Sequence, residues 1–141
     1  MRKLFLPALG LIFVLCSSFI EPKYFVEVWL PVQDSSWVVG HYEKQTDSIY
    51  LGLRTSYEEQ AKNHKSISAS ERPSIKKIYN YSFKELDKLC VPLKDYNFSW
   101  EKDEVIIIKH EGCIEGAYKL KLSGDRSKKQ DKLLKLIYEL K

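Results

Sequence analysis

The chain of 141 residues lacks an apolar run long enough to cross a membrane as a helix. The run from Leu4 to Leu15 spans only about a dozen residues and is interrupted by Pro7 and Gly10, whereas a membrane-spanning helix needs roughly 20. The six glycines stand apart from one another, so no glycine-rich phosphate or dinucleotide loop is present. Like charges never form a block longer than two or three residues. This excludes the basic stripe that a nucleic-acid backbone requires, and nucleic acid is not an expected partner.

The motifs of common catalytic and metal sites are missing as well. No serine stands in a GxSxG elbow, and the three histidines, His41, His64 and His110, form neither HxxxH nor HExxH. His41 and His110 are each followed within two residues by a glutamate, which would orient the ring only if strands brought the two together. Cys90 and His110 lack the third residue that a thiol–imidazole hydrolase needs. The sequence predicts no catalytic residue, no metal ligand and no cofactor.

What the sequence does contain begins with a basic start, Arg2 and Lys3, followed by the apolar run and the small residues Cys16-Ser17-Ser18. This order predicts a cleavable export signal over residues 1–18, because signal peptidase accepts small side chains just before the cut. Two alternatives stay open. Cys16 could carry the lipid of a bacterial lipoprotein, although Leu15 is bulky where small residues are expected, or an uncleaved anchor could extend to Ile20. The expected location is periplasmic or secreted, with a membrane-anchored lipoprotein as the alternative.

Residues 19–141 are enough for one domain with its own core. This part carries 21 basic and 19 acidic residues and is therefore nearly neutral. It contains two cysteines, Cys90 and Cys113, in a compartment where thiols oxidise, so only one pairing is possible. We expect a disulfide between them. Closing that loop would stabilise the fold by roughly 3 kcal/mol.

Several segments have the composition of β-strands. Residues 23–32 are rich in β-branched and aromatic types, and residues 37–42 and 48–54 form a predicted hairpin around a polar turn. Gly40 and Gly52 inside that hairpin indicate a bulge or a close backbone approach. Residues 96–100 and 113–122 are further predicted strands. The run Val105-Ile106-Ile107-Ile108 is typical of a central strand that is buried on both faces.

Three capping boxes predict helix starts. The box at Ser56 predicts a short helix from Tyr57 that runs into a mobile loop over residues 60–74, a tract poor in apolar side chains. The boxes at Ser82 and Ser127 predict a short middle helix and a C-terminal amphipathic helix. The expected class is α+β, with an antiparallel sheet of five or six strands and the C-terminal helix packed on one face.

Aromatic residues are abundant, with nine Tyr, three Trp and six Phe. Tyr and Trp anchor many protein interfaces, because they bury a large area with little loss of rotamer freedom. We expect partner contacts at Trp37, Tyr57, Tyr79 and Tyr81, next to the loop over residues 60–74. The sequence favours a small exported envelope protein that binds another protein without catalysis, of the inhibitor or immunity-protein type. The alternatives are a lipid-anchored structural or assembly component of an envelope machine and, less favoured, a small hydrolase.

Overall fold

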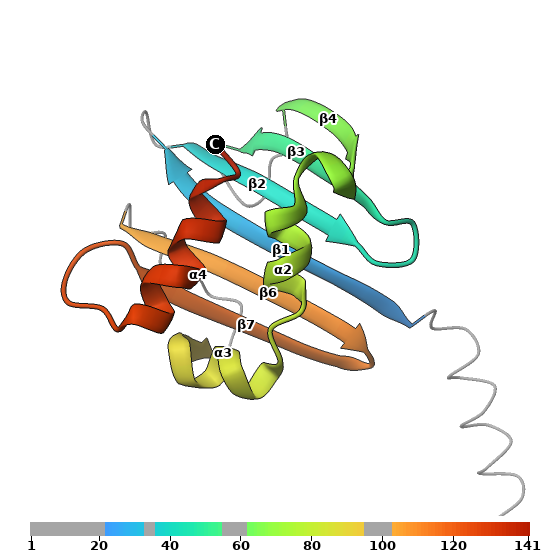
Figure 1. Cartoon of the computed structure of the whole chain (residues 1–141). Helices are drawn as coiled ribbons and strands as arrows, with labels where there is room; N and C mark the ends of the chain where they lie inside the picture. Colours follow the sequence, from blue (N-terminus) through green and yellow to red (C-terminus); the bar gives the residue numbers. More distant parts are fainter. Residues whose placement is uncertain (1–21, 33–35, 55–61, 95–102) are drawn as a thin grey trace, which may run out of the picture.

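The computed structural model describes residues 22–32, 36–54, 62–94 and 103–141. The predicted export signal with Cys16, the helix start at Tyr57 and the predicted strand over residues 96–100 lie outside these residues. The described strands form one antiparallel sheet of seven strands in the order β4-β3-β2-β1-β6-β7-β5 (Figure 1). Their bounds are β1 Lys23–Val32, β2 Ser36–Glu43, β3 Ser48–Arg54, β4 Lys62–Ser68, β5 Val91–Leu93, β6 Glu104–Gly112 and β7 Ile114–Lys121.

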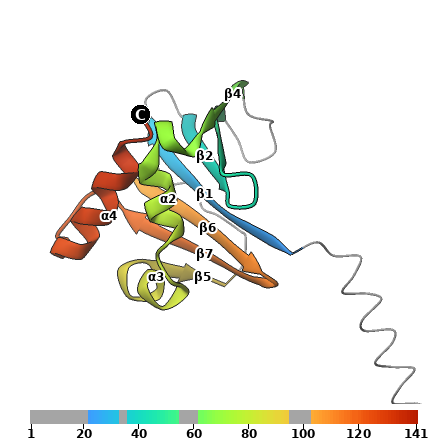
Figure 2. The same ribbon diagram turned by 45° about the vertical axis from the view of Figure 1, so that its right-hand side comes forward.

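The described helices all lie on the same face of this sheet, as Figures 1 and 2 both show. They are the 3₁₀ turn η1 (Ala69–Glu71) and the α-helices α2 (Pro73–Tyr79), α3 (Phe83–Leu89) and α4 (Lys128–Tyr138). We call this side of the sheet the helix-covered face and the other side the helix-free face. The predicted α+β class is confirmed, and the sheet has seven strands where five or six were expected.

Strands β1 and β6 occupy the centre of the sheet and are paired with each other, with Val28 opposite Ile107. Successive side chains of a strand point to opposite faces. Val105 and Ile107 of β6 are fully buried on the helix-covered face, while Ile106 and Ile108 are buried on the helix-free face. The prediction of a central strand with both faces buried is therefore confirmed.

Two hydrophobic clusters result from this alternation. The larger lies between the sheet and the helices and includes Leu30, Ile78 and Leu133, which are fully buried. The smaller lies on the helix-free face, and its buried members are Trp29, Trp37, Val39, Ile106, Ile108 and Ala117. Each Å² of apolar surface removed from water contributes about 25 cal/mol to stability. Both clusters therefore stabilise the sheet, and the larger one also holds the helices against it.

The predicted mobile loop over residues 60–74 is wrong for its described part. Residues 62–68 form the edge strand β4, in which Ile67 pairs with the buried Ile49, and α2 begins at Pro73. The first residues of a helix have no partner within the helix for their N–H groups, so a proline, which lacks the N–H, is accepted there. Pro73 therefore begins α2. The buried residues of α2 include Ile75, Ile78 and Tyr79, which recur at helical spacing.

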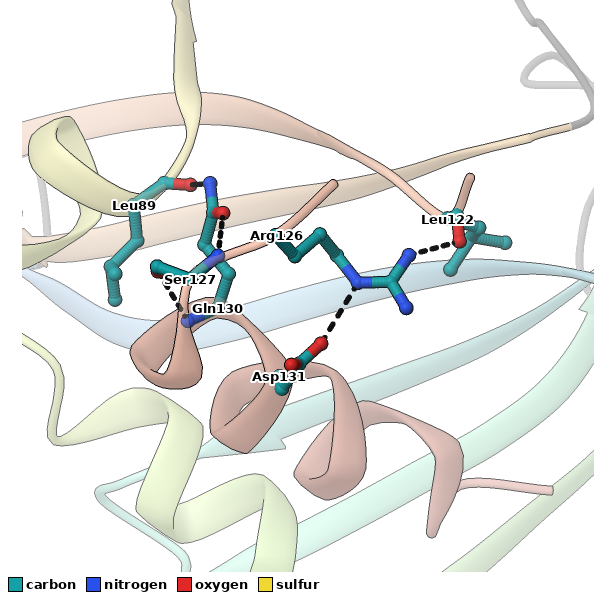
Figure 3. Close-up of polar contacts among 6 residues, drawn as sticks. All are labelled: Leu89, Leu122, Arg126, Ser127, Gln130 and Asp131. Atoms are coloured by element: carbon teal, nitrogen blue, oxygen red, sulfur yellow. Dashed lines mark hydrogen bonds and ion pairs between the residues drawn. The ribbon is translucent and has the colours of Figure 1, made fainter. Parts of the chain in front are cut away.

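Helix α4 is fixed at its N-terminal end by side chains that Figure 3 draws. The predicted capping box is present, because Ser127 Oγ accepts from the Gln130 amide while Gln130 Oε1 accepts from the Ser127 amide. Gln130 Nε2 also donates to the Leu89 carbonyl oxygen over 2.9 Å, which joins α4 to the C-terminal end of α3. Arg126 donates from Nε to Asp131 over 3.0 Å and from Nη1 to the Leu122 carbonyl. These contacts tie the start of α4 to the end of α3 and to Leu122, which directly follows β7.

Gly40 of β2 provides the close approach that the sequence predicts. A Cβ at this position would lie 3.0 Å from Ile75 Cδ1 and 3.0 Å from Leu140 Cδ2. Such contacts are too short for an undisturbed side chain, so glycine lets α2 and the C-terminal end of α4 pack directly against the sheet. Gly52 lies where the β3–β4 register shifts, as expected for a bulge.

The predicted disulfide is corrected by the structure, in which Cys90 and Cys113 both have free thiols. The reason is the register of β7. Cys90 directly precedes β5, whose Val91 pairs with Lys119 near one end of β7, whereas Cys113 lies in the turn that opens β7 at its other end. Burial raises the pKa of the Cys90 thiol to about 12. None of the helices in the described ranges is long and apolar enough to span a membrane.

Candidate functional site

The helix-free face brings together polar side chains that are distant in sequence. Glu27 of β1 is the register partner of His41 of β2, and both side chains project from this face. Glu27 Oε2 lies 3.0 Å from His41 Nδ1, and Glu43 Oε1 lies 3.4 Å from His41 Nε2. The imidazole ring is therefore held between two carboxylates. The sequence indicated Glu43 as a neighbour of His41. It gave no signal for Glu27, because the contact between Glu27 and His41 depends on the pairing of β1 with β2.

Glu27 is the centre of this arrangement. Its second oxygen, Oε1, accepts a hydrogen bond of 2.6 Å from Trp29 Nε1. Burial acts to raise the pKa of Glu27, but the hydrogen bonds from His41 and Trp29, with the charges of His41 and Arg54, outweigh it and hold the pKa below the ordinary value of 4.5. The carboxyl group is therefore ionised at neutral pH. Because a carboxylate only accepts, His41 Nδ1 donates to Glu27, and Nε2 faces a second acceptor, the Glu43 carboxylate.

Four rings form a row across the same face. The ring of Phe25 stacks on His41 at 4.8 Å on one side and on His110 at 5.3 Å on the other, and Tyr50 lies 6.1 Å beyond His41. His110 belongs to β6, Phe25 to β1, His41 to β2 and Tyr50 to β3, so the row crosses four neighbouring strands. The Lys23 carbonyl oxygen accepts a hydrogen bond of 2.9 Å from His110 Nδ1. Cross-strand aromatic contacts of this kind stabilise a sheet and leave a stiff surface.

Arg54, the last residue of β3, lies next to these side chains on the helix-free face. Its guanidinium carbon lies 4.8 Å from the centre of the Trp29 ring, a cation–π distance. Arg54 Nε is buried and has no hydrogen-bond partner within the described ranges. The open-face site, as we name it, consists of Phe25, Glu27, His41, Glu43, Tyr50 and Arg54.

Two adjoining hollows lie over this site, with volumes of about 380 Å³ and about 350 Å³. Both are lined by His41 and Glu43, which form the wall between them. The first is lined further by Glu27, Val39, Tyr50, Gly52 and Arg54, and the second by Lys23, Tyr24, Phe25 and Gln45.

The chemistry of the open-face site follows from the partners of His41. Within the described residues these are the carboxylates of Glu27 and Glu43 and the rings of Phe25 and Tyr50. The carboxylates orient the ring, and the aromatic contacts hold its plane. Among the same residues no group of three or more His, Cys, Asp or Glu side chains is arranged to hold a metal ion.

The residues predicted to contact a partner lie in different places. Trp37 is on the helix-free face but only 8% exposed, and its register partner is Arg54. Tyr79 is 5% exposed and belongs to the core under the helices, so it is not on the surface. Tyr81 is half-buried between α2 and α3, and Tyr57 lies outside the described residues. The side chain of His64 in β4 also lies outside them.

Comparison of the chain with protein-family models, with curated protein sequences and with solved structures gives no match.

Proposed function

We propose that this chain is a non-catalytic binding protein that recognises another protein through the open-face site on the helix-free face of its sheet. The observation that carries the proposal is the row of stacked rings next to two hollows with a common wall. Aromatic and arginine side chains set in a stiff surface are the usual anchors of protein interfaces. The proposal includes export to an envelope or secreted compartment and an inhibitor or immunity-protein role there.

The charges of the open-face site support a protein partner over a strongly charged ligand. Glu27 and Glu43 are opposed by Arg54 and by His41 when its ring is protonated, so the site has no large excess of either sign. Mixed charges at short range fix orientation more than they drive attraction from a distance. A partner surface with complementary polar groups and one or two protruding side chains fits this pattern.

The test is to capture partners from envelope and secreted fractions of the source cells with the full chain carrying a C-terminal tag. Tyr50→Ala removes one anchor of the site, whereas Tyr138→Ala is the matched control, because Tyr138 is a partly exposed tyrosine on α4 of the opposite face. We expect one stoichiometric partner whose retention weakens at least about tenfold with Tyr50→Ala and stays within about twofold with Tyr138→Ala. Equal retention by the two variants, or no partner at all, would contradict the proposal.

The Glu27–His41 pair favours one further candidate, a small hydrolase in which His41 acts as a general base. In such enzymes a carboxylate holds Nδ1 and leaves Nε2 to accept a proton. Here Glu27 holds Nδ1 in that way, while the Glu43 carboxylate lies 3.4 Å from Nε2. His41→Phe keeps a ring on Phe25 but cannot transfer a proton. Loss of a measured turnover in His41→Phe, with partner retention unchanged, would favour the hydrolase over the binding protein.

A further inference from the structure

The outer surface of the helices contains a groove that the open-face site does not use. Two hollows of about 490 Å³ and about 550 Å³ both include Tyr81, Glu85 and Lys132 in their lining, and so form one continuous depression. One wall is α4, and the opposite wall is made by the end of α2 and by α3. We call this depression the helix groove.

Four lysines from three helices line the helix groove: Lys77 of α2, Lys88 of α3, and Lys129 and Lys132 of α4. Among the described residues none of these four lysines forms an ion pair. On the sheet, by contrast, Lys109 pairs with Glu111 and Lys119 pairs with Glu104. The groove has one acidic lining residue, Glu85, and its Oε2 accepts from the Ser82 amide in a capping box. The lining thus carries four positive charges against one negative charge.

The charge of the whole helical layer has the same sign. Residues 69–90 and 126–141 carry eleven Lys and Arg against five Asp and Glu, a formal excess of six positive charges. Residues 22–68 and 91–125, which supply the strands and their turns, carry ten basic and thirteen acidic residues. The near-neutral total therefore hides a strong asymmetry in charge between the helices and the strands. A cleft lined mostly by one sign of charge focuses the field of those charges.

The floor of the helix groove is partly apolar and is held in place from below. Leu89, Leu136 and the ring of Tyr81 are half-buried in it. The Tyr81 carbonyl accepts a hydrogen bond from Nζ of Lys109, a buried lysine of β6 that also lies 5.0 Å from the centre of the Phe83 ring. The wall is equally fixed, because Gln130 ties α4 to the Leu89 carbonyl (Figure 3). Such a preformed groove loses little conformational entropy when it binds.

We propose that the helix groove binds an acidic peptide segment of a protein partner, with carboxylates on the lysines and one or two apolar side chains on the floor. The groove follows α4 from Ser127 to Leu136, about 14 Å at 1.5 Å per residue. This length fits about four residues of an extended chain. The lysines converge on a depression between helices, which favours an inserted chain over the plane of an anionic bilayer.

The test uses a short fluorescein-labelled peptide in which glutamates alternate with leucines, and fluorescence anisotropy with the full chain. Lys129→Glu/Lys132→Glu reverses two groove charges, and Lys128→Glu/Lys135→Glu is the matched control, with the same charge change on exposed residues of α4 that do not line the groove. We expect the first pair to weaken binding about tenfold or more, the control pair to change it less than about threefold, and added salt to weaken the wild-type complex. Thermal melts of both pairs check that the fold is intact.

Three results would overturn the proposal. The peptide does not bind, both pairs weaken it equally, or vesicles of phosphatidylcholine with phosphatidylglycerol bind through the same two lysines while the peptide does not. The first two mean that the lysines only solvate the surface, and the third assigns them to a membrane. None of these results affects the open-face site, whose test rests on Tyr50 and Tyr138.

Discussion

The helix-free face and the helix groove differ in how their charged groups are arranged. On the helix-free face, charged groups are partly buried and paired with each other, as in Glu27 with His41 and Glu104 with Lys119. On the outer surface of the helices, the groove lysines are exposed and form no ion pair within the described ranges. Paired charges fix geometry at short range, and unpaired charges attract an opposite charge from a distance. In our two proposals, the sheet separates a surface that recognises a partner by shape from a surface that captures one by charge.

The largest expected contrast between the faces is in packing, and Ile107 and Ile108 measure it because they are sequence neighbours on opposite faces. Ile107 is fully buried in the large cluster under the helices, while Ile108 is 6% exposed in the smaller cluster. We expect Ile107→Ala to lower the free energy of unfolding by about 3 to 4 kcal/mol and Ile108→Ala by about 2 kcal/mol. Chemical denaturation checks both. Equal costs would mean that the helix-free face is packed as tightly as the core.

The faces should also respond to opposite ends of the pH scale. Burial and the 2.8 Å hydrogen bond to Asp47 raise the pKa of Tyr42, on the helix-covered face, to about 12. Between pH 10 and 12 the unfolded chain loses this proton first, so the free energy of unfolding falls as pH rises. The pKa of Glu27 is lowered. Below pH 4.5 the unfolded chain therefore gains the proton first, and the free energy of unfolding falls as pH falls.

Two variants separate these effects in denaturation curves at several pH values. Tyr42→Phe should cost about 1 kcal/mol at neutral pH and flatten part of the alkaline decline. The rest comes from Tyr118 and Cys90, whose pKa values are also raised to about 12, and from Tyr79 and Tyr81, whose pKa values are raised by burial. Glu27→Gln should flatten the acid decline and leave the alkaline one unchanged. If each variant flattened the opposite decline, the assignment of the pH responses to the two faces would be wrong.

The smallest expected effect is a difference in reactivity between the two thiols, which involves no change in stability. At pH 8 iodoacetamide should modify the exposed Cys113 within minutes and leave Cys90 unmodified until the chain unfolds, because burial raises the pKa of Cys90 to about 12. Peptide mapping distinguishes the two sites. Protection of both thiols until a reductant is added would restore the disulfide that the sequence predicts.

The sequence predicted the elements whose signal is local. Strand β1 has the predicted bounds, and the capping boxes at Ser82 and Ser127 start α3 and α4 as expected. Strand β4 was missed because it is an edge strand whose composition is mostly polar, so it shows no alternation. Helix α2 was missed because its start lies in a tract that is poor in apolar side chains, and its buried residues Ile75, Ile78 and Tyr79 come only after that tract.

The candidate site depended on contacts that no local pattern contains. His41 and Glu27 are fourteen positions apart and meet only because β1 and β2 pair in one register. A shift of one residue would place Glu27 and His41 on opposite faces. The disulfide prediction failed for the same reason, because the number of cysteines does not reveal which end of β7 each one reaches.

The central claim is that partner binding takes place on the helix-free face, and the indole N–H of Trp29 tests it most directly. This group donates to Glu27 within the open-face site, so its NMR signal reports on that site. The partner retained by the wild-type chain is titrated into the ¹⁵N-labelled protein. We predict that the Trp29 indole signal shifts in proportion to the bound fraction. Saturation of the chain with partner while this signal stays in place would contradict the claim.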